Sequence, residues 1–479
     1  MNASQKPSLI FLTVLMLVPA VAAALAGFLD PTFSEGGKDL ILFEPDGCAY
    51  LWGTDIAVQS DGVIVVAGTV VAGGGDSDFG VARLGRDGGL DSGFGIGGEV
   101  RIAFNLGWSW GDYAEGVALQ SDGKIVVVGH VEYSELDTDF AVVRLNPDGS
   151  LDTTFGQGGT TTVWFDLGNL PMDYARGVAI QPDGKILVVG TARDESPSGD
   201  QMAVARLEAN GDLDFTFGSD GKIVIPFDLG GSNEDEARDI AIQPDGKILI
   251  AGDVQDADYN VNPAVAKLNQ DGTLDESFGE GGRVVIPVDL GGNLYDYGRA
   301  IKVLEDGRIV IAGSAATDTS GSDFLLIRLY PNGVPDDDFG THGVVTVPFD
   351  MGGGLWDAAY DVAIQPDGKI IAVGSVARDV GAGDIDFGVV RLLEDGSLDE
   401  TFGDYGGRTV IAFDIGGGWR NEDMARAMAL QPDNGILVVG PVTREPFSTA
   451  WGVVRLMNEL VHLDGFESGD TSAWSVTVP

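Results

Sequence analysis

The sequence is poor in the residue types that most often carry out catalysis. It has one cysteine, Cys48, and three histidines, His130, His342 and His462, among 479 residues. A single cysteine excludes an internal disulfide bond. None of the histidines lies in a His-x-x-x-His or Ser-His-Asp arrangement. The question of enzymatic activity stays open at this point, and a protein without catalytic function is favoured.

Basic residues are also scarce. The chain has 28 Lys and Arg against 74 Asp and Glu, which gives a formal net charge of -46. Proteins that bind nucleic acid or anionic lipid over a broad surface need a basic face. The composition therefore excludes nucleic acid as a partner and favours a soluble protein that attracts cations.

Long apolar runs are missing after the N-terminus. Lys6 precedes an apolar run from Leu9 to Val18, and Ala24-Leu25-Ala26 is a small-x-small cleavage pattern. We interpret residues 1–26 as a signal peptide and expect the mature protein to begin at Gly27. No apolar run reaches membrane-spanning length, so we expect no integral membrane segment after cleavage. The expected location is secreted or on the cell surface.

What the sequence does contain is a repeat. The phrase Gln-Pro-Asp-Gly-Lys-Ile-Leu, or a close variant, occurs seven times with a period of about 61 residues. Its aspartates are Asp61, Asp122, Asp183, Asp245, Asp306, Asp367 and Asp433. Self-similarity at a fixed period indicates a solenoid, a propeller or an array. We assign residues 27–460 to one seven-repeat domain.

The pattern within one repeat predicts four short strands. In the third copy they fall near 161–166, 176–181, 185–190 and 203–207, with a Pro182-Asp183-Gly184 turn between the second and third. Repeated four-stranded sheets describe a β-propeller. We therefore predict an all-β, seven-bladed β-propeller with four antiparallel strands per blade. Residues 38–43 would complete the last blade and close the ring.

The repeat resembles a known family. The segments Leu151–Gly156, Gln181–Lys185 and Asp139–Leu145 are similar to the delta-60 repeat of exported bacterial proteins. The resemblance implies a β-propeller-like extracellular protein and brings no agreed activity or ligand. The similarity to NHL-type propeller repeats is looser. Residues 461–479 form a distinct tail, either a sorting or processing segment or an eighth, degenerate link.

One column of aspartates could bind metal. Each member precedes by two residues the small residue that opens a predicted inner strand: Asp112, Asp173, Asp235, Asp296, Asp357 and Asp423. The first repeat has Leu51 there. Six carboxylates around one mouth of the channel would suit Ca²⁺, a possible cofactor. The alternative is that each aspartate accepts hydrogen bonds from backbone N–H groups of its own loop.

Two further columns have structural interpretations. The basic residues before a leucine are expected to brace strands or blades, with anion binding as the alternative: Arg83, Arg144, Arg206, Lys267, Arg328, Arg391 and Arg455. The phenylalanines of the Leu-Asp-x-x-Phe-Gly links are expected to wedge adjacent blades: Phe33, Phe94, Phe155, Phe217, Phe278, Phe339 and Phe402.

Residues that differ between the repeats are the better functional candidates, because binding sites lie on loops held by a rigid frame. Aromatic residues near the starts of the inner strands could form a ligand rim: Trp52, Trp108, Trp110, Tyr295, Trp356 and Trp419. We interpret the protein as a monomeric binding or structural module for a protein or a glycan. A metal-dependent hydrolase or lyase that uses the aspartate column is the alternative.

Overall fold

The computed structural model describes most of the chain between residues 26 and 458. The described ranges are 26–43, 50–71, 75–104, 106, 111–134, 137–165, 167, 172–193, 199–230, 234–288, 290–291, 295–317, 321–349, 351, 356–379, 383–415, 421–445 and 448–458. The predicted signal peptide up to residue 25, Cys48 and the tail 461–479 lie outside them.

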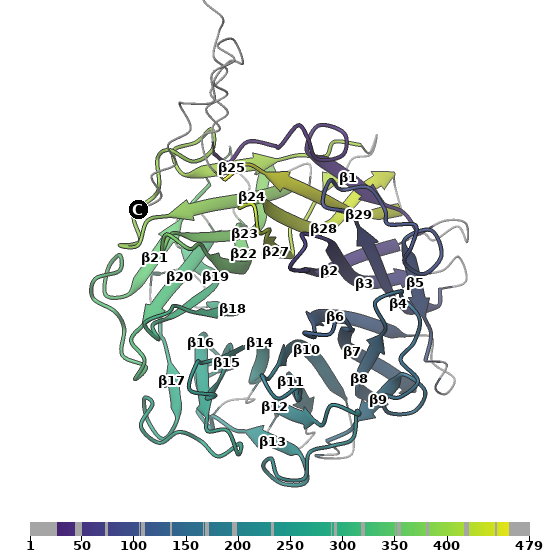
Figure 1. Cartoon of the computed structure of the whole chain (residues 1–479). Helices are drawn as coiled ribbons and strands as arrows, with labels where there is room; N and C mark the ends of the chain where they lie inside the picture. The colour runs from purple at the N-terminus through teal and green to yellow at the C-terminus, as the bar shows by residue number, and fades with distance from the viewer. Residues whose placement is uncertain are drawn as a thin grey trace, which may run out of the picture.

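Seven antiparallel sheets surround a common axis (Figure 1). The strand nearest the axis in each blade is β2 (Tyr50–Val58), β6 (Asp112–Leu119), β10 (Asp173–Ile180), β14 (Glu236–Ile242), β18 (Tyr297–Val303), β22 (Ala358–Ile364) or β27 (Ala427–Leu430). The second strands are β3 (Ile64–Val71), β7 (Ile125–Ser134), β11 (Ile186–Arg193), β15 (Ile248–Gln255), β19 (Ile309–Thr317), β23 (Ile370–Asp379) and β28 (Ile436–Glu445).

The outer half of each blade is built in the same way. The third strands are β4 (Ser77–Leu84), β8 (Asp137–Leu145), β12 (Asp200–Leu207), β16 (Val261–Leu268), β20 (Gly321–Leu329), β24 (Asp384–Leu392) and β29 (Ser448–Leu456). The outermost are β5 (Glu99–Ile102), β9 (Thr160–Val163), β13 (Lys222–Ile225), β17 (Arg283–Val285), β21 (Val344–Val347), β25 (Arg408–Ile411) and β1 (Lys38–Ile41). A short strand, β26 (Asn421–Glu422), pairs in parallel with β24.

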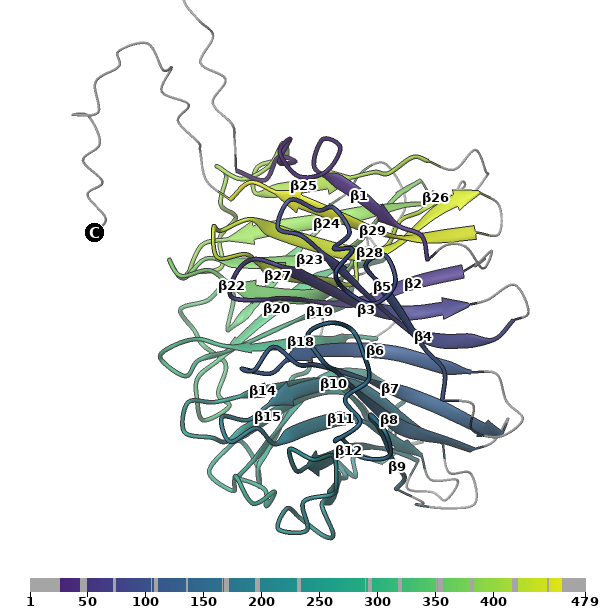
Figure 2. The same ribbon diagram turned by 45° about the vertical axis from the view of Figure 1, so that its right-hand side comes forward.

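The ring is closed by its N-terminal strand, as the sequence predicts. Strand β1 pairs antiparallel with β29, with Lys38 opposite Val454 and Ile41 opposite Trp451. Both views show the purple β1 beside the yellow β29 (Figures 1 and 2). We number the blades 1 to 7 from the sheet of β2 to the sheet of β27, so that β1 is the outer strand of blade 7. The closure covers the edge that β29 would otherwise expose.

The core lies between the blades. The link phenylalanines are fully buried, as predicted for wedges. The basic column lies against these rings: the guanidinium carbon of Arg144 is 4.6 Å from the Phe155 centroid. Arg144 Nε also donates to Asp152 Oδ2 at 2.8 Å, and its Nη1 donates to the Ala209 carbonyl of the next blade. The basic column therefore braces adjacent blades.

The two ends of the ring differ. We call the end where the inner strands begin the loop end, and the end with the Pro-Asp-Gly turns the turn end.

In the described part of the chain, no helix has the length and apolar character needed to cross a membrane.

Candidate functional site: a central cavity lined by arginines

A β-bulge interrupts the inner strand of each of the first six blades. The register shifts lie between Gly53 and Asp55, Ala114 and Gly116, Ala175 and Gly177, Ala237 and Asp239, Gly298 and Ala300, and Ala359 and Asp361. The extra residue is Thr54, Glu115, Arg176, Arg238, Arg299 or Tyr360. Arg426 takes this position in blade 7, immediately before β27. Bulges commonly re-aim a side chain beside a binding site.

These extra residues meet at the axis of the ring. All seven line a single cavity of about 420 Å³, together with Trp52 and Tyr113 from the loop end. Arg176, Arg238, Arg299 and Arg426, which we call the channel arginines, come from four different blades. Four guanidinium groups thus share one cavity in a chain with only 28 basic residues and a net charge of -46.

Two of the channel arginines are neutralised by neighbouring acids. Glu236 Oε2 lies 3.4 Å from Arg176 Nη2 and 2.8 Å from Arg238 Nη2. Arg238 Nη2 also lies 3.2 Å from Asp253 Oδ2. Although burial opposes it, the charges of Asp253 and Glu236 raise the pKa of Arg238 above its ordinary value. The blade 3 and blade 4 side of the cavity therefore has nearly balanced charge.

The other two channel arginines stack on aromatic rings instead. The guanidinium carbon of Arg299 is 4.9 Å from the Tyr297 centroid and 4.7 Å from the Tyr360 centroid. That of Arg426 is 4.3 Å from Tyr360. Within the described ranges, neither arginine has a carboxylate at ion-pair distance. The Nε of Arg299 is buried and has no hydrogen-bond acceptor there. Burial lowers the pKa of Arg299, as expected for a cation without a counter-ion.

Glu115 is the one acid among the extra residues. Burial raises its pKa, and the charges of Arg176, Arg426 and Arg238 oppose that rise. Its side-chain oxygens can accept hydrogen bonds from ligand hydroxyl groups.

A second layer of charge lies directly below the arginines, toward the turn end. Asp55, Asp239 and Asp361 follow the bulge in blades 1, 4 and 6, and each accepts a hydrogen bond from the inner strand of the next blade. The donors are the N–H groups of Val117 at 2.7 Å, Ile301 at 2.9 Å and Met428 at 2.8 Å. These aspartates hold neighbouring inner strands together around the axis.

Lys302 lies among these carboxylates. Its Nζ is 3.3 Å from Asp239 Oδ2 and 3.7 Å from Asp361 Oδ1. Although burial would lower it, these two carboxylates raise the pKa of Lys302. The equivalent position in every other repeat is alanine. The ammonium group thus forms part of a floor beneath the channel arginines.

The aspartates expected at the channel mouth lie at the starts of the inner strands, where they bind backbone N–H groups. Asp173 Oδ2 accepts from Phe165 N at 2.6 Å, and Asp423 Oδ2 accepts from Phe413 N at 2.9 Å. Asp112, Asp235 and Asp357 accept from the equivalent phenylalanines, and Asp296 accepts from Ala316 N at 2.8 Å. Across the described ranges, no three acidic, histidine or cysteine side chains form a group that could hold a metal ion. Calcium binding stays a prediction.

The rim aromatics divide into two sets. Trp52, Tyr295 and Trp356 lie at the loop end with 39%, 42% and 66% of their surface exposed. Trp52 lines the arginine cavity, and Tyr50 stacks against it with centroids 6.3 Å apart. Trp108, Trp110 and Trp419 lie outside the described residues. The structure therefore connects one predicted rim residue, Trp52, with the cavity.

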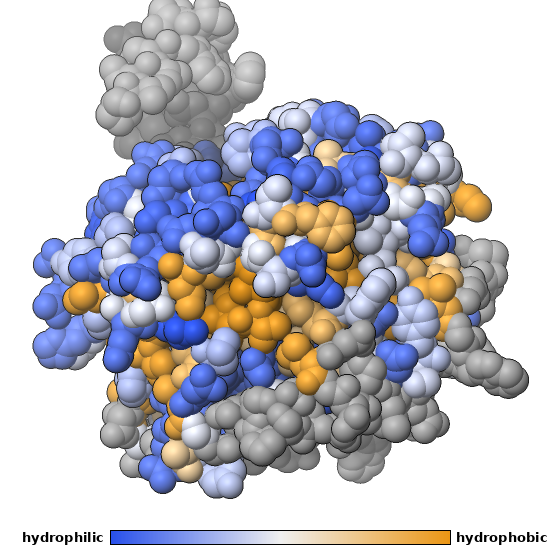
Figure 3. All heavy atoms as spheres, turned by 90° about the horizontal axis from the view of Figure 1, so that it is seen from below, coloured by the Kyte–Doolittle hydropathy of each residue, from blue (hydrophilic) through white to orange (hydrophobic). Residues whose placement is uncertain are grey.

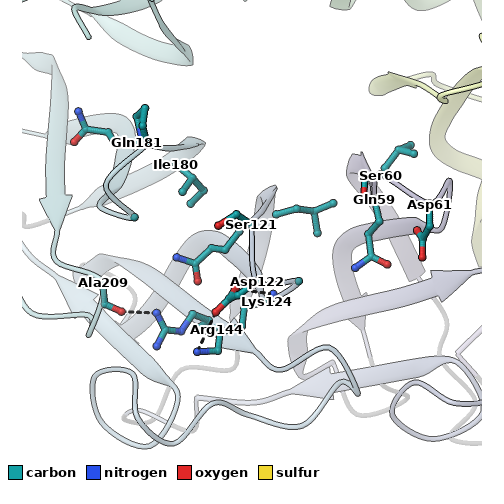
Figure 4. Close-up of a pocket in the computed structure, with 16 residues that line it drawn as sticks. Gln59, Ser60, Asp61, Ser121, Asp122, Lys124, Arg144, Ile180, Gln181 and Ala209 are labelled. Atoms are coloured by element: carbon teal, nitrogen blue, oxygen red, sulfur yellow. Dashed lines mark hydrogen bonds and ion pairs between the residues drawn. The ribbon is translucent and has the colours of Figure 1, made fainter.

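A second cavity opens at the turn end of blades 1 to 3 and measures about 750 Å³ (Figure 4). Gln59 and Gln181, from equivalent positions, lie on its wall, and Figure 4 shows Asp61 near Gln59 and Asp122 beside Lys124. The two cations of this cavity already have partners. Arg144 donates to the Ala209 carbonyl, and Lys124 Nζ lies 3.4 Å from Asp122 Oδ2. This cavity is the larger one but offers a ligand less unpaired charge.

The side of the ring offers a third surface. Figure 3 shows it as mostly hydrophilic, with a hydrophobic area near the middle. Trp164 and Phe215, in blades 2 and 3, are among the exposed large hydrophobic residues of the chain. Nothing in the structure indicates what would cover this area.

The channel arginines were not among the residues that the sequence analysis selected. Each lies three residues after a member of the aspartate column. An arginine at this fixed spacing in four of the repeats was the signal in the sequence. The bulge explains why strand alternation did not point to them, because the extra residue departs from the alternating pattern and lines the cavity at the axis.

The fold and the repeats define the class of the chain, a seven-bladed β-propeller repeat protein. Six segments match a family model described as "Domain of unknown function (DUF5122) beta-propeller": residues 59–94, 120–155, 181–217, 243–278, 304–339 and 365–402. These six segments are similar to the repeats of this β-propeller family. The description does not use the narrower name delta-60. No curated protein matches the chain.

The solved structures that match the chain have low sequence identity and TM-scores below 0.5. A protein of unknown function from Dyadobacter fermentans is 10% identical, with 90% of this chain and 100% of that chain covered and a TM-score of 0.44. An ulvan lyase of polysaccharide lyase family PL25 is 13% identical, with 92% and 96% covered and a TM-score of 0.44. An α-L-arabinanase from Penicillium chrysogenum is 11% identical, with 71% and 92% covered and a TM-score of 0.41. Resemblance at this level says nothing about the ligand or activity of the present chain.

Proposed function

We propose that this β-propeller is a binding module that receives an anionic ligand in the central cavity. The observation that carries the proposal is the convergence of Arg176, Arg238, Arg299 and Arg426 on one cavity of an otherwise strongly acidic chain. Burying cations together is unfavourable unless they are paired. Two of these arginines have no carboxylate at ion-pair distance among the described residues, and an anion would supply one.

The proposal refines the expectation of a protein or glycan module with a ligand-binding rim. The rim residue Trp52 lines the same cavity as Arg426. A ligand that enters from the loop end can therefore contact both an aromatic ring and a guanidinium group. Guanidinium groups bind carboxylate and sulfate oxygens through paired, charge-assisted hydrogen bonds.

The proposal is tested by thermal melting of the protein in increasing sulfate or malonate, with chloride at matched ionic strength as the reference. A ligand that binds the native state raises the melting temperature in a concentration-dependent way. We expect a rise in sulfate or malonate beyond that in chloride. The Arg299→Met/Arg426→Met double variant should show a clearly smaller difference, because only the general stabilisation by sulfate remains.

Arg86→Met is the matched control, because Arg86 is exposed and ion-paired with Asp433 outside the cavity. It should respond to the anions as the unchanged protein does. Equal shifts in chloride and in the test anions would contradict the proposal, as would a full response in the double variant.

Export is a second part of the proposal and is supported by the N-terminal sequence alone. The expected product is a protein that starts at Gly27. Mass spectrometry of protein recovered outside the producing cells tests this. A mass that includes residues 1–26 would contradict it.

A further inference from the structure

The unpaired positive charge of the cavity is concentrated on one side. Glu236 and Asp253 neutralise Arg238, and Glu236 also lies near Arg176. Arg299 and Arg426, by contrast, contact only aromatic faces and neutral groups in the part of the chain that the structure describes. An anion is therefore attracted most strongly to blades 5 to 7, where Tyr360 lies between the two guanidinium groups.

The wall next to Arg426 has a different chemistry. Blade 1 contributes Thr54, a much shorter side chain than the arginines at the equivalent position, so the cavity has room on this side. Trp52 lines the cavity just above, toward the loop end. Moving from blade 5 around to blade 1, a ligand thus meets guanidinium groups first and then an indole ring.

This combination matches a particular ligand chemistry. A sugar acid carries a planar carboxylate, which pairs with guanidinium groups. It also has an apolar C–H face, which can pack on an aromatic ring. Its hydroxyl groups can donate hydrogen bonds to the side-chain oxygens of Glu115.

Charge argues against ligands with densely spaced negative groups. The chain has a net charge of -46, and exposed charges interact over about 8–10 Å at ordinary ionic strength. A nucleic acid or a heavily sulfated chain would have most of its charges outside the cavity, close to this acidic surface. A ligand with few, widely spaced carboxylates avoids this cost.

We infer that the ligand is an acidic carbohydrate whose carboxylate is bound by Arg299 and Arg426 and whose sugar ring packs on Trp52. This inference rests on the proposed function, because it names the ligand class for the same cavity. An acidic peptide would also present carboxylates, but its flexible backbone has no equivalent of the sugar's C–H face for the indole.

The test is titration calorimetry with three probes of similar size: a uronic-acid trisaccharide, the same trisaccharide with methyl-esterified carboxyl groups, and triglutamate. Trimers of galacturonate and of glucuronate are both used. We expect the acid trisaccharide to bind at least about tenfold more tightly than its ester, since charge-assisted hydrogen bonds contribute about 1.5–3 kcal/mol. Triglutamate should bind more weakly than the acid trisaccharide.

Variants separate the two halves of the site. Arg426→Met and Arg299→Met should each weaken binding of the acid trisaccharide about tenfold or more. Trp52→Ala should weaken binding of the acid trisaccharide by a similar factor and leave the melting-temperature response to sulfate unchanged. Arg86→Met and Trp164→Ala are matched controls outside the cavity. They should change neither the binding of the trisaccharide nor the response to sulfate. Circular dichroism confirms that each variant is folded.

The outcomes test the carbohydrate inference and the anion site separately. Triglutamate binding as tightly as the sugar acid, with no effect of Trp52→Ala, would overturn the carbohydrate inference and leave the anion site intact. An ester that binds as well as the acid, or acid binding unaffected by both arginine variants, would overturn the anion site itself. Tight binding of the acid trisaccharide that depends on both Trp52 and Arg426 would support the carbohydrate inference and the anion site.

Discussion

Gly190 lies directly beneath the backbone carbonyl of Tyr174, so close that a Cβ atom on Gly190 would be 1.9 Å from the carbonyl oxygen. Gly190 belongs to the second strand of blade 3, and Tyr174 to the bulged inner strand. The same close approach recurs in other blades, for example between Gly252 and the Glu236 carbonyl. Glycine in the second strand therefore permits the bulge that turns Arg176 toward the axis.

We predict that Gly190→Ala destabilises the protein by about 3 kcal/mol or more. The added methyl group meets backbone, which cannot rotate away as a side chain can, and overpacking of this kind costs about 1–3 kcal/mol or more. The change is measured as the shift in the midpoint of denaturant unfolding.

Gly89→Ala provides the control for this prediction. Nothing lies within 4 Å of a Cβ atom built on Gly89, and its φ lies outside the left-handed region. It should be neutral or stabilising by up to about 1 kcal/mol, because alanine restricts the unfolded chain. Equal midpoints for the two variants would contradict the close-approach argument.

The repeat made the fold predictable from the sequence, because its period, strand pattern and Pro-Asp-Gly turns all indicate the same architecture. The position of residues 38–43 in the phase of the repeat was enough to predict ring closure. Glycine inside the second strand was a signal for a bulge or a close backbone approach. This signal predicts a bulge at residue 176, the extra residue that lines the central cavity.

The site was harder to predict for a physical reason. A strand without a bulge alternates its side chains between two faces, and that rule sets Arg176 and Gly177 on opposite faces. The aspartate column repeats in six copies, which made it a candidate metal site. A hydrogen-bonding role that recurs in every blade produces the same repetition. The pairing of Glu236 with two arginines joins neighbouring blades and has no local sequence pattern.

We predict that Asp357→Asn lowers the melting temperature equally with a chelator and with millimolar Ca²⁺. Asp357 accepts from Phe349 N and from Ala377 N, both at 3.1 Å. An amide replaces one acceptor by a donor, so a buried N–H loses its partner at a cost of about 1–3 kcal/mol.

Melting curves with chelator, Ca²⁺ and Mg²⁺ check this prediction. A rise specific to Ca²⁺ in the unchanged protein, absent from Asp357→Asn, would instead identify the column as a metal site. That result would also favour the metal-dependent hydrolase or lyase as the function to examine next.

We predict that Lys302→Met destabilises the protein more at pH 7.5 than at pH 4.5. The variant leaves the carboxylates of Asp239 and Asp361 without the ammonium group that lies 3.3 Å and 3.7 Å from them. Lys302 is partly exposed, so solvent screening reduces the loss to about 1–2 kcal/mol at pH 7.5. Burial raises the pKa of Asp361, so this carboxyl group takes up a proton as the pH falls and the repulsion weakens.

Denaturant unfolding at both pH values measures the difference, and Lys302→Arg serves as the control that keeps the charge. It should lose less stability than Lys302→Met. A methionine variant as stable as the unchanged protein at pH 7.5 would show that the ammonium group does not stabilise the floor of the cavity.

The buried carboxyl groups predict an unusual dependence of stability on pH. Burial raises the pKa of Asp55, Asp112 and Asp386 to about 7 and that of Asp235 to about 6. Between about pH 4 and pH 7, the native state therefore holds protons that the unfolded state has released. The free energy of unfolding falls as pH rises whenever the native state binds more protons. Each such group contributes up to about 1.4 kcal/mol per pH unit.

Paired aspartates act in the opposite direction at lower pH. Although burial opposes it, hydrogen bonds from Lys247 and Ser277 lower the pKa of Asp275 to about 2. Stability from such groups is present above the unfolded pKa near 4 and is lost as pH falls toward 2. The two effects together set a stability maximum between about pH 4 and pH 5.

We therefore expect the denaturant midpoint to fall from pH 4.5 to pH 7.5 at constant ionic strength, with a smaller fall in Asp112→Asn. Asparagine cannot ionise, so the variant lacks the contribution of one raised pKa, while its side-chain oxygen can still accept from Phe104 N, the donor to Asp112 at 2.8 Å. Asp87→Asn, at an exposed position, is the control and should keep the full fall. High salt separates this effect from general repulsion among the acidic residues, because screening weakens repulsion between exposed charges more than the ionisation of a buried group. A midpoint that rises toward pH 7.5, or an Asp112→Asn variant with the same fall as the control, would show that these carboxyl groups are charged in the native state across this range.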